Sequence, residues 1–423
     1  MILSPKPNPP HRKQWGEIST DKSLSHRGVI FSFLTNGRCE LKNFLCSKDT
    51  LATLEIAKKL GAQVIQNGSD ISITPPKEIT KNALLDCQNS GTAMRLYAGL
   101  LSGIEGVYEF IGDESLSSRP MKRIKTPLEL MGAKMSSAFA PFILQGSKEL
   151  KGIEYHSPIS SAQVKSAFIL SSLFATSASS FSEIFLSRDH TERFLLSLGA
   201  PLEISNYGIK ISPLKEKLKN YCFEIPNDPS SVVFFVIACL ISCNQSMSFS
   251  NVLLNPTRIE AFEILKKMGA KLEYKILKDE IEPIGEVSVA SSQLCGIEVS
   301  ERISWLIDEL PALSIAFACA SGESKVSNAG ELRSKECDRI KAIVENLNAL
   351  GIEAKEFENG FSVVGGEFAE GVAESFNDHR IAMSFALVGI KTRVRIKNAN
   401  CVDVSFPRFF EFLKEWVEVE NES

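Results

Sequence analysis

The chain has 423 residues, of which 44% are hydrophobic and 23% charged, as is ordinary for a globular protein of two or three domains. Its net charge of −4 argues against sequence-independent binding of nucleic acid, and its longest apolar run, 232–241, is too short to span a membrane. The polar segment 1–15 has no secretory signal, so we expect a cytoplasmic protein.

The ten cysteines show neither the spacing of a metal site nor that of a disulfide framework. Cys239 and Cys243 lie at helical spacing near the end of the apolar run, and we expect both to be buried. The other eight are scattered singly, which is typical of a reducing compartment. We therefore expect no metal and no cofactor.

The first motif in chain order is DKSLSHR, at 21–27. Asp21 or Ser23 could cap a helix that begins in the apolar run after the motif. Lys22, Ser23 and Arg27 would then present a cation, a hydroxyl and a guanidinium near a helix start, as phosphate binding requires. For His26 we favour a packing role, and the alternative for the whole motif is an ordinary solvated helix start.

Four further segments place small or cationic residues before apolar helices. NSGTAMR at 89–95 combines Gly91, which allows close backbone approach, with Arg95 one turn later, and SSRPMKRI at 117–124 supplies Arg119. The segment 157–175 has serines and Gln163 directly before a helix, and SRDHTERFL at 187–195 adds Arg188. Taken singly, each is also consistent with helix capping or a solvated loop.

The C-terminal half places acids among cations. In 305–322, Asp308 and Glu309 lie between two apolar stretches; capping explains one of them, and Asp308 is the better candidate for proton transfer. In ELRSKECDRI at 331–340, Lys335 and Arg339 are expected on one helical face beside Glu336, with a surface ion-pair lattice as the alternative. NDHRIAMSFAL at 377–387 places Arg380 at the head of a helix, where it could bind a carboxylate or phosphate.

A helix followed by Gly and a pair of strands recurs along the chain, with the glycines at Gly61, Gly132, Gly199, Gly269 and Gly351. Glycine here is expected to end each helix in the left-handed conformation. A sixth helix, 408–417, is expected to end the chain without its strands. The pattern predicts six α/β units in two sets of three, and we expect the N-terminal strand to complete the sixth unit. The chain would then cross between the two sets near residue 20 and near residue 227.

Taken together, DKSLSHR, NSGTAMR, SRPM, SSAQ, SRDHTE, IDELP, ELRSKECDR and NDHRIAM closely resemble the 3-phosphoshikimate 1-carboxyvinyltransferase (EPSP synthase) family, in that family's order. The resemblance implies an inside-out α/β barrel of two domains, each of three βαβαββ repeats, with the active site in the interdomain cleft. Residues 21–226 would bind shikimate 3-phosphate. Residues 1–20 and 227–423 would carry the catalytic acids and arginines for phosphoenolpyruvate. The implied activity transfers the enolpyruvyl group of phosphoenolpyruvate to the 5-hydroxyl of shikimate 3-phosphate by addition–elimination, in the shikimate pathway.

The resemblance also assigns roles to residues. The expected catalytic residues are Lys22, Asp308 and Glu336. The expected shikimate 3-phosphate ligands are Lys22, Ser23, Arg27, Ser161, Ala162, Gln163, Arg188, Asp308 and Lys335. The expected phosphoenolpyruvate ligands are Lys22, Gly91, Arg95, Arg119, Gln163, Arg339 and Arg380. Gly91 is expected to border the pocket in which glyphosate competes with phosphoenolpyruvate.

Several positions depart from the family pattern. Ser19-Thr20 and Asn227-Asp228-Pro229 replace the usual residues at the two crossings. Val404 stands where some members have a phosphoenolpyruvate-binding lysine, and the nearby Lys397 is not at that position.

Two alternative functions come from different classes. The sister enzyme that transfers enolpyruvyl to a UDP-amino sugar shares the fold but has a catalytic cysteine in a mobile loop, whereas no cysteine lies between Cys87 and Cys222 here. A non-catalytic, anion-binding relative is disfavoured because Lys22, Asp308 and Glu336 are all present. We expect a monomer with two small-molecule substrates.

Overall fold

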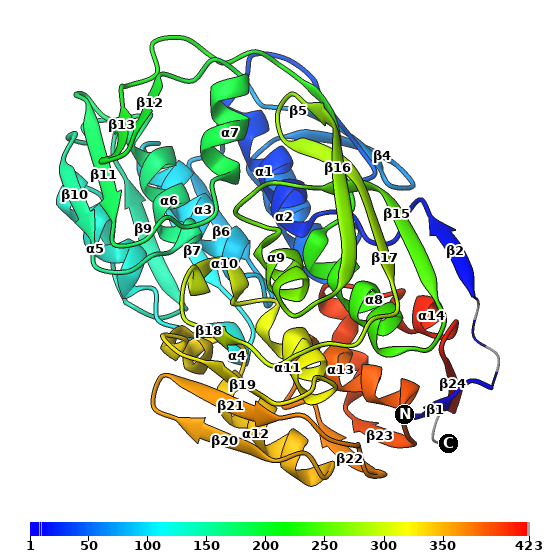
Figure 1. Cartoon of the computed structure of the whole chain (residues 1–423). Coiled ribbons are helices and arrows are strands. Elements are labelled where there is room, and N and C mark those ends of the chain that lie inside the picture. The colour runs from blue at the N-terminus through cyan, green and yellow to red at the C-terminus, as the bar shows by residue number, and fades with distance from the viewer. Residues whose placement is uncertain (8, 10, 421–423) are drawn as a thin grey trace. The chain divides into compact units, whose positions relative to one another are not determined.

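The structure is a computed structural model that describes residues 1–7, 9 and 11–420 (Figure 1). By its internal contacts the chain divides into two units. Unit 1 comprises Met1–Ser19, Pro226–Asp279 and Pro283–Ser423, and unit 2 comprises Thr20–Ile225 and Glu280–Glu282. The chain therefore passes between the two units at 19/20 and at 225/226. The short exchange at 280–282 had no sequence signal.

The described residues form six four-stranded sheets, three in each unit. In every sheet the first pair of strands is parallel and the next two pairs are antiparallel. A parallel pair needs a crossover, which a helix supplies. Of the two antiparallel pairs, one joins strands that are separated by a second helix, and the other is a hairpin or, in one sheet, pairs the two ends of the chain. This arrangement is the βαβαββ repeat, so the predicted fold class is confirmed.

Two repeats of unit 2 are continuous in the chain. The first is β6 (Asn82–Asp86), α3 (Gly91–Ser102), β7 (Gly106–Ile111), α5 (Lys122–Met131), β8 (Lys134–Met135) and β9 (Phe142–Gly146), with a short α4 (Glu114–Ser117) before α5. The second is β10 (Glu154–Ser157), α6 (Ala162–Ser172), β11 (Ser179–Glu183), α7 (His190–Ser197), β12 (Leu202–Ser205) and β13 (Gly208–Ile211). The third is closed by the last strand of the unit: α1 (Lys22–Phe31), β3 (Cys39–Lys42), α2 (Lys48–Lys59), β4 (Gln63–Asn67), β5 (Asp70–Thr74) and β14 (Cys222–Glu224). The 3₁₀ segment η1 (Ser32–Leu34) follows α1.

Unit 1 is closed in the same way by strands from the N-terminus. The first repeat is β2 (Arg12–Trp15), α8 (Pro229–Ile241), β15 (Ser246–Leu253), α9 (Glu260–Lys267), β16 (Lys271–Asp279) and β17 (Pro283–Ala290). The second is β18 (Glu298–Val299), α11 (Leu310–Ala318), β19 (Glu323–Val326), α12 (Arg339–Ala349), β20 (Ala354–Phe357) and β21 (Gly360–Val364), with α10 (Ile303–Leu306) and η2 (Gly330–Ser334) inserted. The third is β22 (Gly371–Glu374), α13 (His379–Ala386), β23 (Val394–Lys397), α14 (Phe409–Leu413), β24 (Val417–Glu420) and β1 (Ile2–Pro5), with η3 (Leu387–Ile390) and η4 (Ala399–Val404).

The C-terminal end differs from the prediction. The expected helix over 408–417 is shorter, and strand β24 follows it and pairs antiparallel with β1, so that the red and blue ends of the chain lie side by side in Figure 1. Cys239 is buried as predicted, but Cys243 is exposed because α8 ends at Ile241. The five repeat glycines all have positive φ, between 82° and 115°, as helix-ending residues should.

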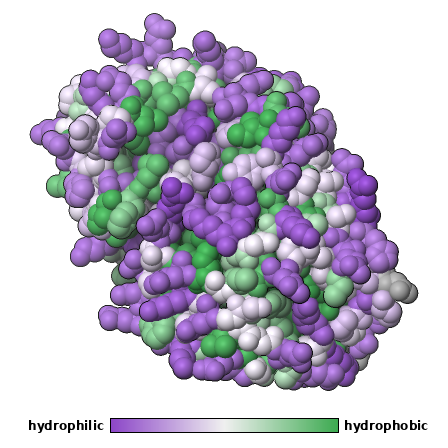
Figure 2. All heavy atoms as spheres, in the orientation of Figure 1, coloured by the Kyte–Doolittle hydropathy of each residue, from purple (hydrophilic) through white to green (hydrophobic). Residues whose placement is uncertain are grey.

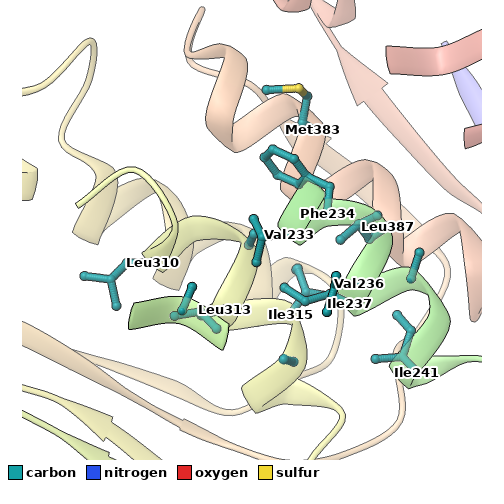
Figure 3. Close-up of a cluster of buried hydrophobic side chains, with 14 of the residues drawn as sticks. Val233, Phe234, Val236, Ile237, Ile241, Leu310, Leu313, Ile315, Met383 and Leu387 are labelled. Carbon is teal, nitrogen blue, oxygen red and sulfur yellow. The ribbon is translucent and has the colours of Figure 1, made fainter. Parts of the chain in front are cut away.

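The core of unit 1 lies between its three central helices. Every residue of α8, α11 and α13 is buried, and Figure 3 shows Val236, Leu313 and Met383 among the side chains that meet there. A helix that is apolar all round must be covered on every side. The sheets carry this cover: their strands alternate buried and exposed residues, as in β17 and β19. Polar residues predominate on the face seen in Figure 2, with apolar residues in smaller groups between them. No helix among the described residues is both long enough and apolar enough to cross a membrane.

Helices α3 and α6 of unit 2 pack closely because α3 has Gly99 at the contact. A Cβ on Gly99 would lie 2.8 Å from the carbonyl carbon of Ala167 in α6, and closer still to its oxygen and Cα. Backbone atoms in a buried helix cannot move aside as a flexible side chain can.

We therefore predict that Gly99→Ala destabilises the protein by about 1–3 kcal/mol, even though alanine has the higher helix propensity by about 1 kcal/mol. Urea denaturation should show a lower midpoint. Gly37→Ala is the control, because its methyl would be in ordinary contact at 3.6 Å from Asn220. Equal midpoints for Gly99→Ala and the wild type would show that α3 and α6 are not held this closely.

Candidate functional site

Several of the predicted binding residues of unit 2 lie at the starts of helices. Asp21 caps α1 by accepting a hydrogen bond from the Leu24 N–H at 2.7 Å, which decides between the two proposed caps. Helix α1 begins at Lys22, so Lys22 and Ser23 lie in its first turn. Ser90 caps α3 in the same way, through the Ala93 N–H at 3.1 Å. The partial positive charge of each helix N-terminus therefore lies beside the predicted ligands.

Arg27 is fixed by hydroxyl groups from two other helices. Its Nε donates to Thr191 Oγ1 of α7 at 2.8 Å, and its Nη2 donates to Ser166 Oγ of α6 at 2.9 Å. The two hydroxyls also lie 2.6 Å apart. Its Nη1 donates to the Ser23 carbonyl of its own helix at 3.1 Å. The guanidinium is buried, so the network holds it in one orientation and joins α1, α6 and α7.

A second network joins α3 to α6 through Gln163. Its side-chain carbonyl accepts from Arg95 Nη1, and its amide donates to Thr92 Oγ1 at 2.9 Å. Arg119 donates to Asn89 Oδ1 at 2.9 Å, directly before the same helix α3. Gln163, Arg95 and Arg119 are all half-buried. Three predicted ligands from separate motifs therefore lie around the N-terminal end of α3.

Lys22 pairs with Asp49, at the start of α2, while 20% of its side chain remains accessible. The adjacent His26 is buried, with Nδ1 2.6 Å from Thr53 Oγ1. Burial, together with the nearby Lys22 and Arg27 charges, holds the pKa of His26 well below its usual value. His26 is therefore neutral near pH 7, and the positive charge of this motif comes from Lys22 and Arg27.

Arg339 organises the acids of unit 1. Its Nε donates to Asp378 at 2.7 Å and its Nη2 to Glu336 at 2.7 Å, while Nη1 lies 3.4 Å from Asp308. The side chains of Arg339 and Asp378 are 1% and 0% exposed, whereas those of Asp308 and Glu336 are 32% and 21% exposed. Burial would lower the pKa of Arg339, but the three carboxylates raise it, so the guanidinium stays charged. One buried cation thus holds both predicted catalytic acids, each partly accessible.

Arg380 and α8 extend this cluster. Arg380 Nη1 donates to the Ser230 carbonyl at 2.7 Å, and the hydroxyl of Ser230 contacts the buried Glu309. Arg258 pairs with Asp228, the cap of α8, at 2.7 Å. Glu309 precedes α11 but makes no capping hydrogen bond, so burial against Ser230 rather than capping explains this acid.

Lys335 and Arg339 do not share a helix, contrary to the prediction. Lys335 follows the 3₁₀ segment η2, and Arg339 is the first residue of α12. The N-cap of α12 explains the break, because Asp338 accepts the Lys341 N–H at 3.1 Å and so starts this helix after Lys335. Lys335 instead pairs with Glu331 at 2.8 Å and stays 26% exposed.

Comparison with known proteins agrees with this picture. The family model described as EPSP synthase (3-phosphoshikimate 1-carboxyvinyltransferase) matches residues 14–413. A 3-phosphoshikimate 1-carboxyvinyltransferase of Campylobacter jejuni subsp. doylei is 51% identical over 404 residues, which are 94% of each chain. One from Helicobacter pylori is 50% identical over 415 residues, covering 94% of this chain and 96% of the relative.

The chain belongs to the EPSP synthase family. Among solved structures, an EPSP synthase from Acinetobacter baumannii matches with a TM-score of 0.87 and 34% identity, covering 99% of both chains. The family resemblance inferred from the motifs is therefore confirmed.

Within this family member, the described contacts link some of the predicted site residues in separate small groups. The described contacts join Arg27 to Ser23, and Arg95 to Gln163, in unit 2, and they join Asp308, Glu336 and Arg339 in unit 1. Ser161 and Ala162 lie at the start of α6, and Arg188 is half-buried two residues before α7. Lys397 lies at the end of β23, 53% exposed and 3.8 Å from Glu374.

Sequence reasoning missed the partners that hold these residues. Asp378 had a usable signal, since it is a helix cap two residues before the predicted site residue Arg380. Asp49 and Ser166 had none, because each meets its cation only through packing of separate helices.

Proposed function

We propose that this chain transfers the enolpyruvyl group of phosphoenolpyruvate to the 5-hydroxyl of shikimate 3-phosphate, releasing phosphate. This step belongs to the shikimate pathway, which leads to chorismate and the aromatic amino acids. The observation that carries the proposal is the pairing of Asp308 and Glu336 on one buried arginine, in a family member whose motifs for two phosphorylated substrates are all present.

The charges support substrates of this kind. Two substrates that each carry a phosphate and a carboxylate bring roughly six negative charges. The proposed cationic ligands are Lys22, Arg27, Arg95, Arg119, Arg188, Lys335, Arg339 and Arg380. In unit 1, however, carboxylates already surround Arg339. We therefore assign Arg339 a role in holding the acids as well as in attracting phosphoenolpyruvate.

The proposed mechanism is addition followed by elimination. Asp308, with or without Lys22, orients the 5-hydroxyl and removes its proton as the oxygen attacks C2 of phosphoenolpyruvate. Glu336 or a neighbouring cation protonates the methylene carbon C3. Elimination then removes a proton from the new methyl group and expels inorganic phosphate. Arginines on the phosphate and carboxylate groups stabilise the charge that develops. Lys22 belongs to unit 2 and both acids belong to unit 1. This mechanism therefore requires residues of both units to act on one pair of substrates.

The decisive experiment measures phosphate release with each substrate alone and with both together, in the presence of a chelator. We expect release only with both substrates, and formation of 5-enolpyruvylshikimate 3-phosphate by mass spectrometry. Turnover of a UDP-amino sugar with phosphoenolpyruvate would favour the sister enzyme. No release with either pair would favour a non-catalytic relative.

We predict that Glu336→Gln lowers kcat by about 10²- to 10⁴-fold, because the amide keeps the shape of the side chain but cannot transfer a proton. Steady-state kinetics and a thermal melt should show lost turnover with an unchanged fold. Glu345→Gln, on the exposed side of helix α12, which begins three residues after Glu336, is the control. A kcat within about threefold of wild type would remove Glu336 from the acid–base pair.

We also predict that glyphosate inhibits the enzyme and that Gly91→Ala weakens this inhibition about tenfold or more. A Cβ on Gly91 would lie 2.8 Å from Nη1 of Arg95, so the guanidinium would have to leave its place beside Gln163. Inhibition constants against phosphoenolpyruvate measure the effect. Gly366→Ala serves as control, because its methyl would make only an ordinary contact, 3.5 Å from Ile352. Equal inhibition of wild type and Gly91→Ala would contradict the placement of Gly91 beside the phosphoenolpyruvate pocket.

A further inference from the structure

The segment 187–192, which carries the proposed substrate ligand Arg188, is held by buried partners at several points. The Ser187 N–H donates to Glu183 at 2.7 Å, and Glu192 pairs with Lys165 at 2.7 Å. Lys165 and Glu192 are almost completely buried, and Lys165 also donates to the Ser187 carbonyl at 3.1 Å. Both ends of the segment are therefore fixed to α6 and β11 within unit 2.

The middle of the segment is held from a distant part of the chain. His190, the first residue of α7, has its Nδ1 2.6 Å from Oε1 of Glu282, and the two side chains are 1% and 0% exposed. Glu282 lies in the turn between β16 and β17, which form a long ribbon in Figure 1. Although both strands belong to unit 1, residues 280–282 group with unit 2. Pro283, which follows Glu282, restricts it to an extended backbone.

The contact with Glu282 is next to the network that fixes Arg27. Thr191 follows His190 in the first turn of α7, and its hydroxyl accepts from Arg27 Nε at 2.8 Å. Arg188 lies two residues before His190. A buried polar group that loses its partner costs free energy and tends to move toward another partner or water. Loss of Glu282 would therefore shift His190, and with it the turn that places Thr191 and Arg188.

We propose that Glu282 is a positioning residue for shikimate 3-phosphate binding: its carboxylate holds His190, so that Thr191 keeps Arg27 in place and Arg188 keeps its position in the proposed substrate phosphate site. This inference rests on the proposed function. It differs from a purely structural role of the pair, which would change stability while leaving substrate binding unaltered.

The test compares Glu282→Ala, Glu282→Gln and Glu280→Gln, the last being an exposed neighbour in the same turn. We expect Glu282→Ala to raise the KM for shikimate 3-phosphate about tenfold or more, the effect of losing a hydrogen bond to a charged group. The KM for phosphoenolpyruvate should change by less than about twofold. Glu282→Gln retains an oxygen that can accept from His190 and should recover most of the binding, and Glu280→Gln should match the wild type.

A double-mutant cycle with His190→Ala completes the experiment, with thermal melts of every variant. The two substitutions together should raise the KM for shikimate 3-phosphate by less than the product of their separate effects, because each removes the same interaction. A lower melting temperature of Glu282→Ala with an unchanged KM would overturn the proposal. If Glu282→Ala does not fold, Glu282→Gln is compared with a folded His190→Ala instead. Equal KM values of these two variants for shikimate 3-phosphate would also overturn the proposal. An inactive wild type would instead contradict the proposed function.

Discussion

Apolar helices that must be covered on every side impose the main constraint on this molecule. The residues of α8, α11 and α13 are buried along their whole length, and most of α1, α3 and α6 is buried too. Each buried Leu, Ile, Val or Phe contributes about 1.5–3 kcal/mol, so displacing such a helix would be costly. Many of the proposed functional groups consequently lie near the N-terminal ends of helices or in the loops before them. Their N-terminal ends carry the capping acids and hydroxyls, unsatisfied N–H groups and partial positive charge that suit anions.

Cations at these helix ends are kept in place by specific partners. Arg27 is held by hydroxyl groups and a carbonyl, whereas Arg339 is surrounded by three carboxylates. The first arrangement fixes the orientation of the guanidinium that we propose binds the substrate phosphate. The second orients two acids and keeps their negative charge close to a cation. The two units thus use the same repeat to build groups of different composition, for which we propose substrate binding in one unit and proton transfer in the other.

The repeat glycines made much of the fold predictable. Gly61, Gly132, Gly199, Gly269 and Gly351 each end a helix with positive φ, a conformation that other residues rarely adopt, so sequence alone could locate the helix ends. Closure of the last sheet by the N-terminal strand followed from counting units. The helix over 408–417 was placed less well, because the apolar pattern of Trp416 and Val417 is satisfied equally by the start of a strand. The break between Lys335 and Arg339 was missed because charge spacing does not reveal a 3₁₀ segment followed by a capped helix.

The sequence by itself determined the repeat, the fold class and the family, since each depends on local signals: helix-ending glycines, strand alternation and short motifs in a fixed order. Only the tertiary structure decided which groups hold the functional side chains, such as Asp378 on Arg339, Asp49 on Lys22 and Glu282 on His190. The reason is physical: a buried charge takes whichever partner packing brings within about 3 Å. His190 and Glu282 are separated by 92 residues along the chain, so no local pattern could have paired them.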